Sequence, residues 1–140
     1  KNQQDTLVKL SEQVVTKDLE VSGQSKLGSG ATTLGDKSNV TLDSTEGNML
    51  TITFASTPKP VVATLSFVSD DYAYSVKILF DGSSKVYADN CLSSNGVPVA
   101  ITATTDGATV TFKHAHPALT EGTTGTLFYE VSGHDVTIVS

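Results

Sequence analysis

Residues 97–114 read VPVAITATTDGATVTFKH, and this stretch decides the fold class. Apolar and polar side chains alternate in residues 97–101 and again in residues 108–112, which is the period of a strand with one face in water. Asp106 and Gly107, which lie between the two segments, are residues that favour a turn. The stretch therefore predicts two short strands separated by a turn.

The same pattern continues through most of residues 49–139, where turn-forming residues separate segments of strand character. The expected strands are 49–54, 60–67, 74–80, 85–89, 97–104, 108–114, 125–132 and 135–139. Short, evenly spaced strands of this kind are typical of a β-sandwich. We therefore expect an all-β, jelly-roll-like sandwich that forms a head domain over residues 47–140.

Composition excludes several classes of function. The chain has 140 residues, and its nine Lys, absence of Arg and fifteen acidic residues give a net charge of −6. This charge argues against a nucleic-acid partner, which needs a basic surface. No apolar run is long enough to cross a membrane, so we expect no membrane insertion. A single Cys excludes an internal disulfide framework.

All nine aromatic residues lie between Phe54 and Tyr129, so none falls in the first 53 residues. Because aromatic side chains dominate compact cores, we do not expect residues 1–46 to form a core of their own. Leu7, Leu10 and Val14 have the spacing of one a/d stripe of a helix. Two heptads are too short to hold a lone helix in water. Residues 1–15 are therefore either a frayed terminus or the end of a trimeric coiled coil.

In residues 16–46, Gly residues follow short alternating segments. Leu27-Gly28 and Leu34-Gly35 are seven residues apart, and Val40-Thr41-Leu42 repeats the alternation. This pattern favours a chain that turns repeatedly about an axis, and we expect an intertwined β stalk in a homotrimer. Three copies would bury one another's aliphatic side chains there. The expected axis residues are Leu7, Leu10, Val14, Leu19, Val21, Leu27, Leu34, Val40 and Leu42.

The order of these parts resembles that of bacteriophage fibre proteins, either tail fibres or head fibres. Residues 19–28, LEVSGQSKLG, and residues 31–35, ATTLG, are similar to the stalk repeats of such fibres. The resemblance implies a homotrimer on a virion, with a C-terminal head that attaches to a host-surface glycan or protein. The chain begins at Lys1 without an initiator Met or a signal peptide, so we expect it to be a fragment that lacks the anchoring end.

A carbohydrate-binding module or bacterial adhesin domain that acts as a monomer is the alternative function. Catalysis is not expected, because the chain has no Gly-x-Ser-x-Gly motif and no recognisable pair of glycosidase carboxylates. Cys91 also has no nearby basic group to activate its thiol. We expect no cofactor.

Several polar segments of the head are candidate binding sites. Residues 69–74, SDDYAY, combine paired carboxylates with Tyr rings that stack on sugars. The carboxylates can accept hydrogen bonds from sugar hydroxyls or contribute oxygen ligands to Ca²⁺. The alternative for this segment is an acidic turn with Tyr74 already in the core. Residues 89–90 and 93–95 are expected to form similar polar loops. The candidate binding residues are Asp70, Asp71, Tyr72, Tyr74, Asp89, Asn90 and Asn95.

His114 and His116 are two residues apart, so both imidazoles point to one face if this segment is a strand. Copies of the pair around a threefold axis would then supply nitrogen ligands for one metal ion. The alternative is a pair of half-exposed His residues at the end of a strand.

Overall fold

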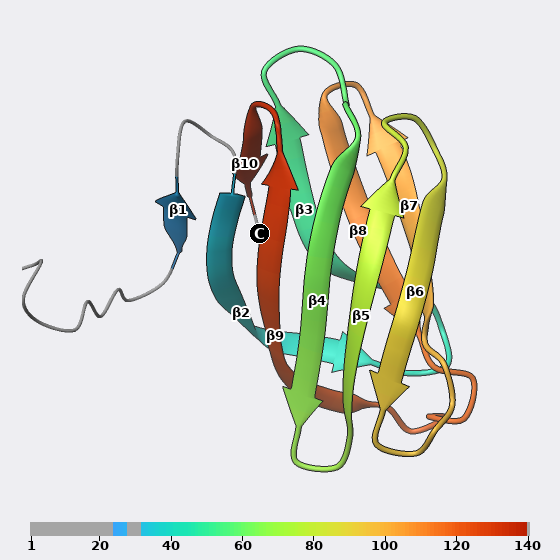
Figure 1. The fold of residues 1–140 in the computed structure, drawn as a ribbon. Coiled ribbons are helices and arrows are strands. Elements are labelled where there is room, and N and C mark those ends of the chain that lie inside the picture. Colours follow the sequence, from blue (N-terminus) through green and yellow to red (C-terminus); the bar gives the residue numbers. More distant parts are fainter. Residues whose placement is uncertain (1–23, 28–31, 140) are drawn as a thin grey trace, which may run out of the picture.

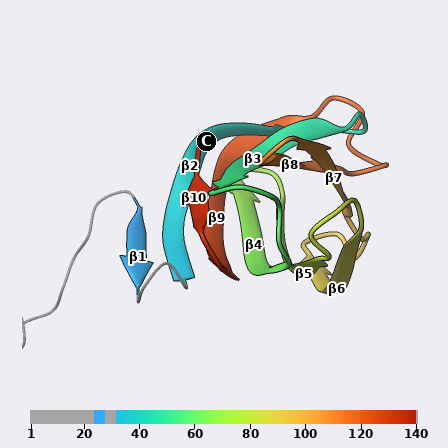
Figure 2. The same ribbon diagram turned by 90° about the horizontal axis from the view of Figure 1, so that it is seen from above.

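The computed structural model describes residues 24–27 and 32–139, which form two antiparallel β-sheets. The six-stranded sheet has the order β1-β2-β9-β4-β5-β6, and the four-stranded sheet has the order β10-β3-β8-β7. The sheets lie face to face, with β1 and β2 at one edge (Figures 1 and 2). The strands are β1 (Ser25–Leu27), β2 (Thr32–Leu42), β3 (Gly47–Phe54), β4 (Val61–Ser69), β5 (Ala73–Phe80), β6 (Val86–Ser93), β7 (Ala100–Asp106), β8 (Thr109–Ala115), β9 (Thr123–Gly133) and β10 (Val136–Ile138).

The predicted all-β sandwich is confirmed, and each of the eight predicted strands is present. The largest difference is in β6, which continues to Ser93 instead of ending near residue 89. Its pairing with β5 shifts between Ser75 and Lys77, and this irregularity lets the strand pass through polar residues that resemble a loop. The described residues include no helix long and apolar enough to cross a membrane.

The core lies between the two sheets, because each long strand alternates buried and exposed positions. Val61, Ala63, Leu65 and Phe67 of β4 are buried, whereas the residues between them face outward. Across the interior, the rings of Phe80 on β5 and Phe112 on β8 meet edge to face with centroids 5.8 Å apart. Burying a large apolar side chain of this kind contributes about 1.5–3 kcal/mol to the free energy of unfolding.

The order of the strands differs from the jelly-roll-like order that we expected. β4, β5 and β6 follow one another as a meander within one sheet, instead of being distributed over both sheets. β9 returns from the other sheet to pair with both β2 and β4. The two-sheet architecture is therefore as predicted, but its connections are not.

Strand β2 corrects the predicted boundary at residue 46. It pairs with β9 from Thr32 to Leu42, and Val40 and Leu42 are buried in the core of the chain itself. Residues 32–42 thus belong to the sandwich and not to a stalk, and Val40 and Leu42 do not line a trimer axis. The glycine at position 35 is explained by this packing and not by a stalk repeat, because the ring of Tyr129 occupies the space that a Cβ would need.

For the other predicted axis residues, the structure gives less information. The helical stripe of residues 1–15, with Leu7, Leu10 and Val14, lies outside the described residues, as do Leu19 and Val21. The backbone of Leu27 pairs with β2 in β1, and its side chain is outside the description. Leu34 is half-buried on β2, opposite Glu130. The coiled coil and the trimer stay predictions.

Gly125 on β9 offers a test of the packing between neighbouring strands. A Cβ at this position would clash with the carbonyl oxygen of Val68 and lie 2.8 Å from Cα of Ser69. We expect Gly125→Ala to lower the free energy of unfolding by about 1–3 kcal/mol, because backbone must move. Thermal melts measure the loss, with Gly47→Ala as the control because its Cβ would meet only Thr41 O, at 3.7 Å. Equal losses in the two variants would contradict this account.

Candidate functional site

Four connections meet at one end of the sandwich, which we call the loop end. They are residues 43–46, 70–72, 94–99 and 116–122, and they follow β2, β4, β6 and β8. Figure 1 shows them together at the lower end of the molecule. Loops held by a rigid sheet scaffold are common positions for binding residues, so this end is the first place to look for a site.

Hydrogen bonds join these connections to one another and to the strand ends. The backbone N–H of His116 donates to the carbonyl of Asp43 at 2.8 Å, which joins two of the connections. Two further bonds act in the same way: Thr123 Oγ1 donates to Ser69 Oγ at 2.8 Å, and the N–H of Ala73 donates to Ser94 Oγ at 3.2 Å. The loop end is therefore braced into one surface, which lowers the entropy lost when a ligand binds.

His114 lies fully buried beneath this surface and connects the two sheets. Its Nε2 lies 2.8 Å from the carbonyl oxygen of Thr41, and its Nδ1 lies 2.8 Å from the Tyr74 hydroxyl. A carbonyl oxygen only accepts, so Nε2 carries the proton and Nδ1 accepts from Tyr74. Burial lowers the pKa of the His114 imidazole, against the opposing effects of the Thr41 hydrogen bond and the nearby Asp43 charge. The imidazole is therefore neutral at pH 7.

His116 is also fully buried, and it fixes two connections. Its Nδ1 accepts from the backbone N–H of Ala118 at 3.0 Å. Because Nδ1 accepts, the ring proton is on Nε2, which donates to Asn95 Oδ1 at 3.3 Å. The same Asn95 oxygen accepts from the N–H of Val97 at 3.0 Å. Asn95, predicted as a ligand-binding residue, thus holds its own turn and the His116 ring.

These contacts correct the prediction of a metal site at His114 and His116. The two side chains do share one face, but that face is the core, and the ring nitrogens are already bonded within the chain. A metal ion needs a free nitrogen lone pair from each His. Within the described residues, no group of three or more His, Cys, Asp or Glu is placed to hold a metal ion.

The acidic and the aromatic residues of the predicted binding segment 69–74 lie in different environments. Asp70 and Asp71 are exposed at the loop end, as a binding role requires. Tyr72 and Tyr74 are buried, and the Tyr72 ring meets the His116 ring edge to face, with centroids 4.8 Å apart. The prediction that these two Tyr faces stack on sugars is therefore wrong, because both rings belong to the core.

Asp89 and Asn90 do not form a loop. Both lie within β6, and Asp89 pairs with Lys77 on β5, away from the loop end. Asp89 is exposed, and the side chain of Asn90 is outside the description. The prediction that these residues share a polar loop is therefore wrong, and the loop end is formed without them.

A hollow of about 280 Å³ opens between the 70–72 and 116–122 connections. Asp71 and Glu121 supply carboxylates to it, Thr120 and Thr123 supply hydroxyls, and Leu119 adds an apolar surface. Sequence reasoning missed the 116–122 side of this hollow, which carries no motif. The only signal was the turn-forming Glu121-Gly122 pair, and Gly122 does adopt a positive φ of 76°.

We compared the chain with known families, proteins and structures. No protein-family model, no curated protein and no solved structure matches the chain.

The buried imidazole of His114 makes stability depend on pH. Below about pH 6.5, the ordinary pKa of a His, the unfolded chain takes up a proton on His114. The folded chain does so only at a lower pH, because burial lowers this pKa. We therefore expect the free energy of unfolding to fall as the pH drops from about 6.5 to the folded pKa, below which this loss is complete.

Thermal melts between about pH 8 and about pH 5 measure this effect, with His114→Gln as the comparison. The melting temperature of the variant should fall less over this range than that of the wild type. Proton NMR of the wild-type imidazole gives a second measurement that needs no variant. A His114 ring that titrates at or above the ordinary value would show that the account is wrong.

Proposed function

We propose that this chain is a non-enzymatic attachment module, the C-terminal part of a homotrimeric virion fibre of the bacteriophage type. Its loop end would bind a glycan on the host surface. The observation that carries the proposal is the loop end itself, where four connections are braced into one surface by backbone and side-chain hydrogen bonds, among them those of the buried His116. Such a surface is organised before the ligand arrives, which is what a receptor-binding head needs.

The chemistry of the loop end favours an uncharged or amino-bearing glycan. Asp70, Asp71 and Glu121 are exposed there, and the four connections contain no Lys. Carboxylates accept hydrogen bonds from sugar hydroxyls and attract ammonium groups, whereas they repel phosphate and sulfate. Beside them, the Thr120 hydroxyl adds a donor and an acceptor, and the Thr123 hydroxyl, which donates to Ser69, adds an acceptor.

Two observations support the fibre part of the proposal: the order of segments in the sequence, and the position of β1 at the edge of the sandwich. The stripe of Leu7, Leu10 and Val14 precedes the Gly-containing segment, in the order found in fibre stalks. β1 lies at the outer edge of the six-stranded sheet, so the residues that precede it join the head at that edge. A head with an upstream oligomerising segment at one edge suits a fibre tip.

Loop-end variants test the attachment function. We expect Asp70→Asn/Asp71→Asn and Glu121→Gln to weaken binding on an array of neutral and amino-bearing glycans by about 10–100-fold, because a hydrogen bond to a charged group contributes about 1.5–3 kcal/mol. Asp106→Asn is the matched control, since Asp106 is exposed in the β7–β8 turn at the opposite end. Binding that all these variants retain, or a preference for sulfated glycans, would count against the loop end.

The mass of the full chain in solution separates the fibre from the alternative function. Sedimentation equilibrium at micromolar concentration should give three times the mass of one chain. A mass of one chain, with glycan binding intact, would instead favour the monomeric carbohydrate-binding module or adhesin domain.

A further inference from the structure

We propose that the outer face of the six-stranded sheet is the surface on which a second copy of this chain packs. The inference rests on the homotrimer of the proposed function, and it adds where the copies meet. The outer face is the one formed by the outward-pointing residues of β2, β9, β4, β5 and β6. It borders the loop end at Ser94 of the 94–99 connection, which lines the hollow described below.

Large apolar side chains are exposed on this face. Leu92 is 71% exposed and Phe128 is 48% exposed. Among the described residues, only one large apolar side chain of comparable exposure, Val139, lies elsewhere. Concentrations of this kind mark surfaces that bind a partner. The full set on the outer face is Val62, Val68, Leu79, Tyr87, Leu92 and Phe128.

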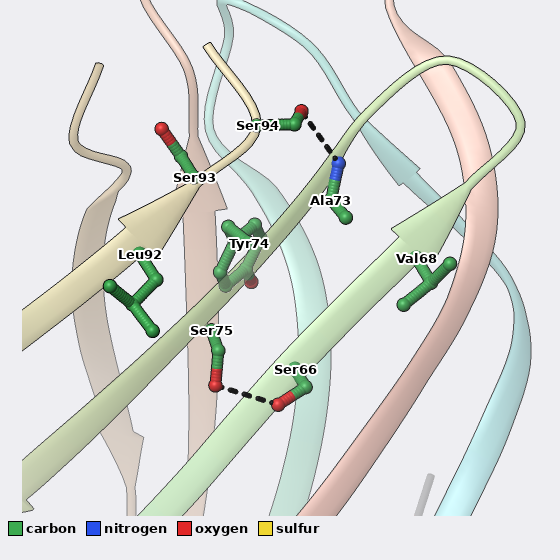
Figure 3. Close-up of a pocket in the computed structure, with 8 residues that line it drawn as sticks. All are labelled: Ser66, Val68, Ala73, Tyr74, Ser75, Leu92, Ser93 and Ser94. Carbon is green, nitrogen blue, oxygen red and sulfur yellow. Dashed lines mark hydrogen bonds between the residues drawn. The ribbon is translucent and has the colours of Figure 1, made fainter. Parts of the chain in front are cut away.

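Two of these side chains, Val68 and Leu92, line a trough, and the strand register explains its floor. Phe128, Ser66, Ser75 and Leu92 are successive partners across β9, β4, β5 and β6. Ser66 and Ser75 are small and bond to each other at 2.8 Å, so they form a low floor between large neighbours. Figure 3 shows this floor with Leu92 and Val68 on either side of it. The hollow above it is about 350 Å³ and its lining is mostly apolar carbon.

A row of charges crosses the face beside the trough. Glu130, Thr64, Lys77 and Asp89 are successive partners across the same four strands. The row is therefore negative at Glu130 on β9, positive at Lys77 on β5 and negative again at Asp89 on β6. Glu130 and Lys77 also line one shared depression of the surface.

Both rows therefore divide the face into halves that complement each other. The β9 half presents the Phe128 ring and the Glu130 carboxylate, whereas the β5–β6 half presents most of the trough and the Lys77 ammonium, with the Asp89 carboxylate beside it on β6. A threefold arrangement uses unlike patches, so the β9 half of each copy meets the β5–β6 half of the next. In that arrangement Phe128 enters the neighbouring trough beside Leu92, and Glu130 faces Lys77 of the neighbour.

The entry point of the chain favours a second copy over other occupants. β1 is the edge strand of this same sheet, on the side of the β9 half. The 23 residues before Gln24 carry the predicted coiled-coil stripe. Copies joined through that segment would bring their β9 halves close to their neighbours.

A pair of Cys substitutions tests the contact directly. In a Cys91→Ser background, we expect full-length Phe128→Cys/Leu92→Cys to oxidise to covalent dimers and trimers, whereas neither single variant does so. Within one chain the two positions are three strand spacings apart, about 14 Å, which exceeds the reach of a disulfide. Both side chains are largely exposed, so circular dichroism should show an unchanged fold. Phe128→Cys/Thr104→Cys is the control, since Thr104 lies on the outer face of the other sheet and should not cross-link.

The outcomes separate this inference from the proposed function. A species of three chain masses that does not cross-link overturns the packing surface but leaves the fibre in place. A species of one chain mass overturns the trimer, and this inference fails with it. Cross-linking of Leu92→Cys alone means that like halves meet, which contradicts the proposed pairing. Glycan binding that Phe128→Ser and Leu92→Ser abolish in an intact trimer would assign the face to the ligand instead.

Discussion

The hydrogen bonds of the buried His114 ring are the contact on which the loop end depends. The ring projects from β8 of one sheet and bonds to Thr41 on β2 and Tyr74 on β5 of the other. A buried polar group without a partner costs about 1–3 kcal/mol, so the bonded arrangement selects one relative position of the sheets. Two residues further on, His116 holds the 94–99 and 116–122 connections in the same way. Stability and the shape of the candidate site therefore have a common origin.

The parts of the fold that were predictable are those with local signals. The eight strands from residue 47 onward have alternation and turn residues within a few positions of one another. β2 alternates only in part, because Asp36 to Asn39 interrupt the pattern before Val40 and the pairing shifts between Lys37 and Val40. Asn39 also takes a positive φ of 59°. Its partner β9 lies about ninety residues away in the chain, so only the folded structure reveals that β2 belongs to the sandwich.

The candidate site was predictable only in part, both in its positions and in its chemistry. A period of two places His114 and His116 on one face, but it does not say whether that face is wet or dry. Here Val110 and Phe112 precede them on the same buried side, so the two rings serve the core. The same ambiguity applies to Tyr72 and Tyr74. Asp70 and Asp71, by contrast, lie in a turn, where exposure follows from the turn itself.

The outer face of the six-stranded sheet has to be reconciled with the charge of the chain. At −6 per copy, like charge opposes the approach of one copy to another. At physiological ionic strength this repulsion fades within about 8 Å, so contact groups decide whether copies bind. In the proposed packing, Phe128 and Leu92 would supply apolar area at contact, and Glu130 facing Lys77 would supply an attraction that wrongly aligned copies lack. In the proposed trimer, net acidity would keep the assembly from binding anionic surfaces unspecifically, while the pattern on this one face would select the correct partner.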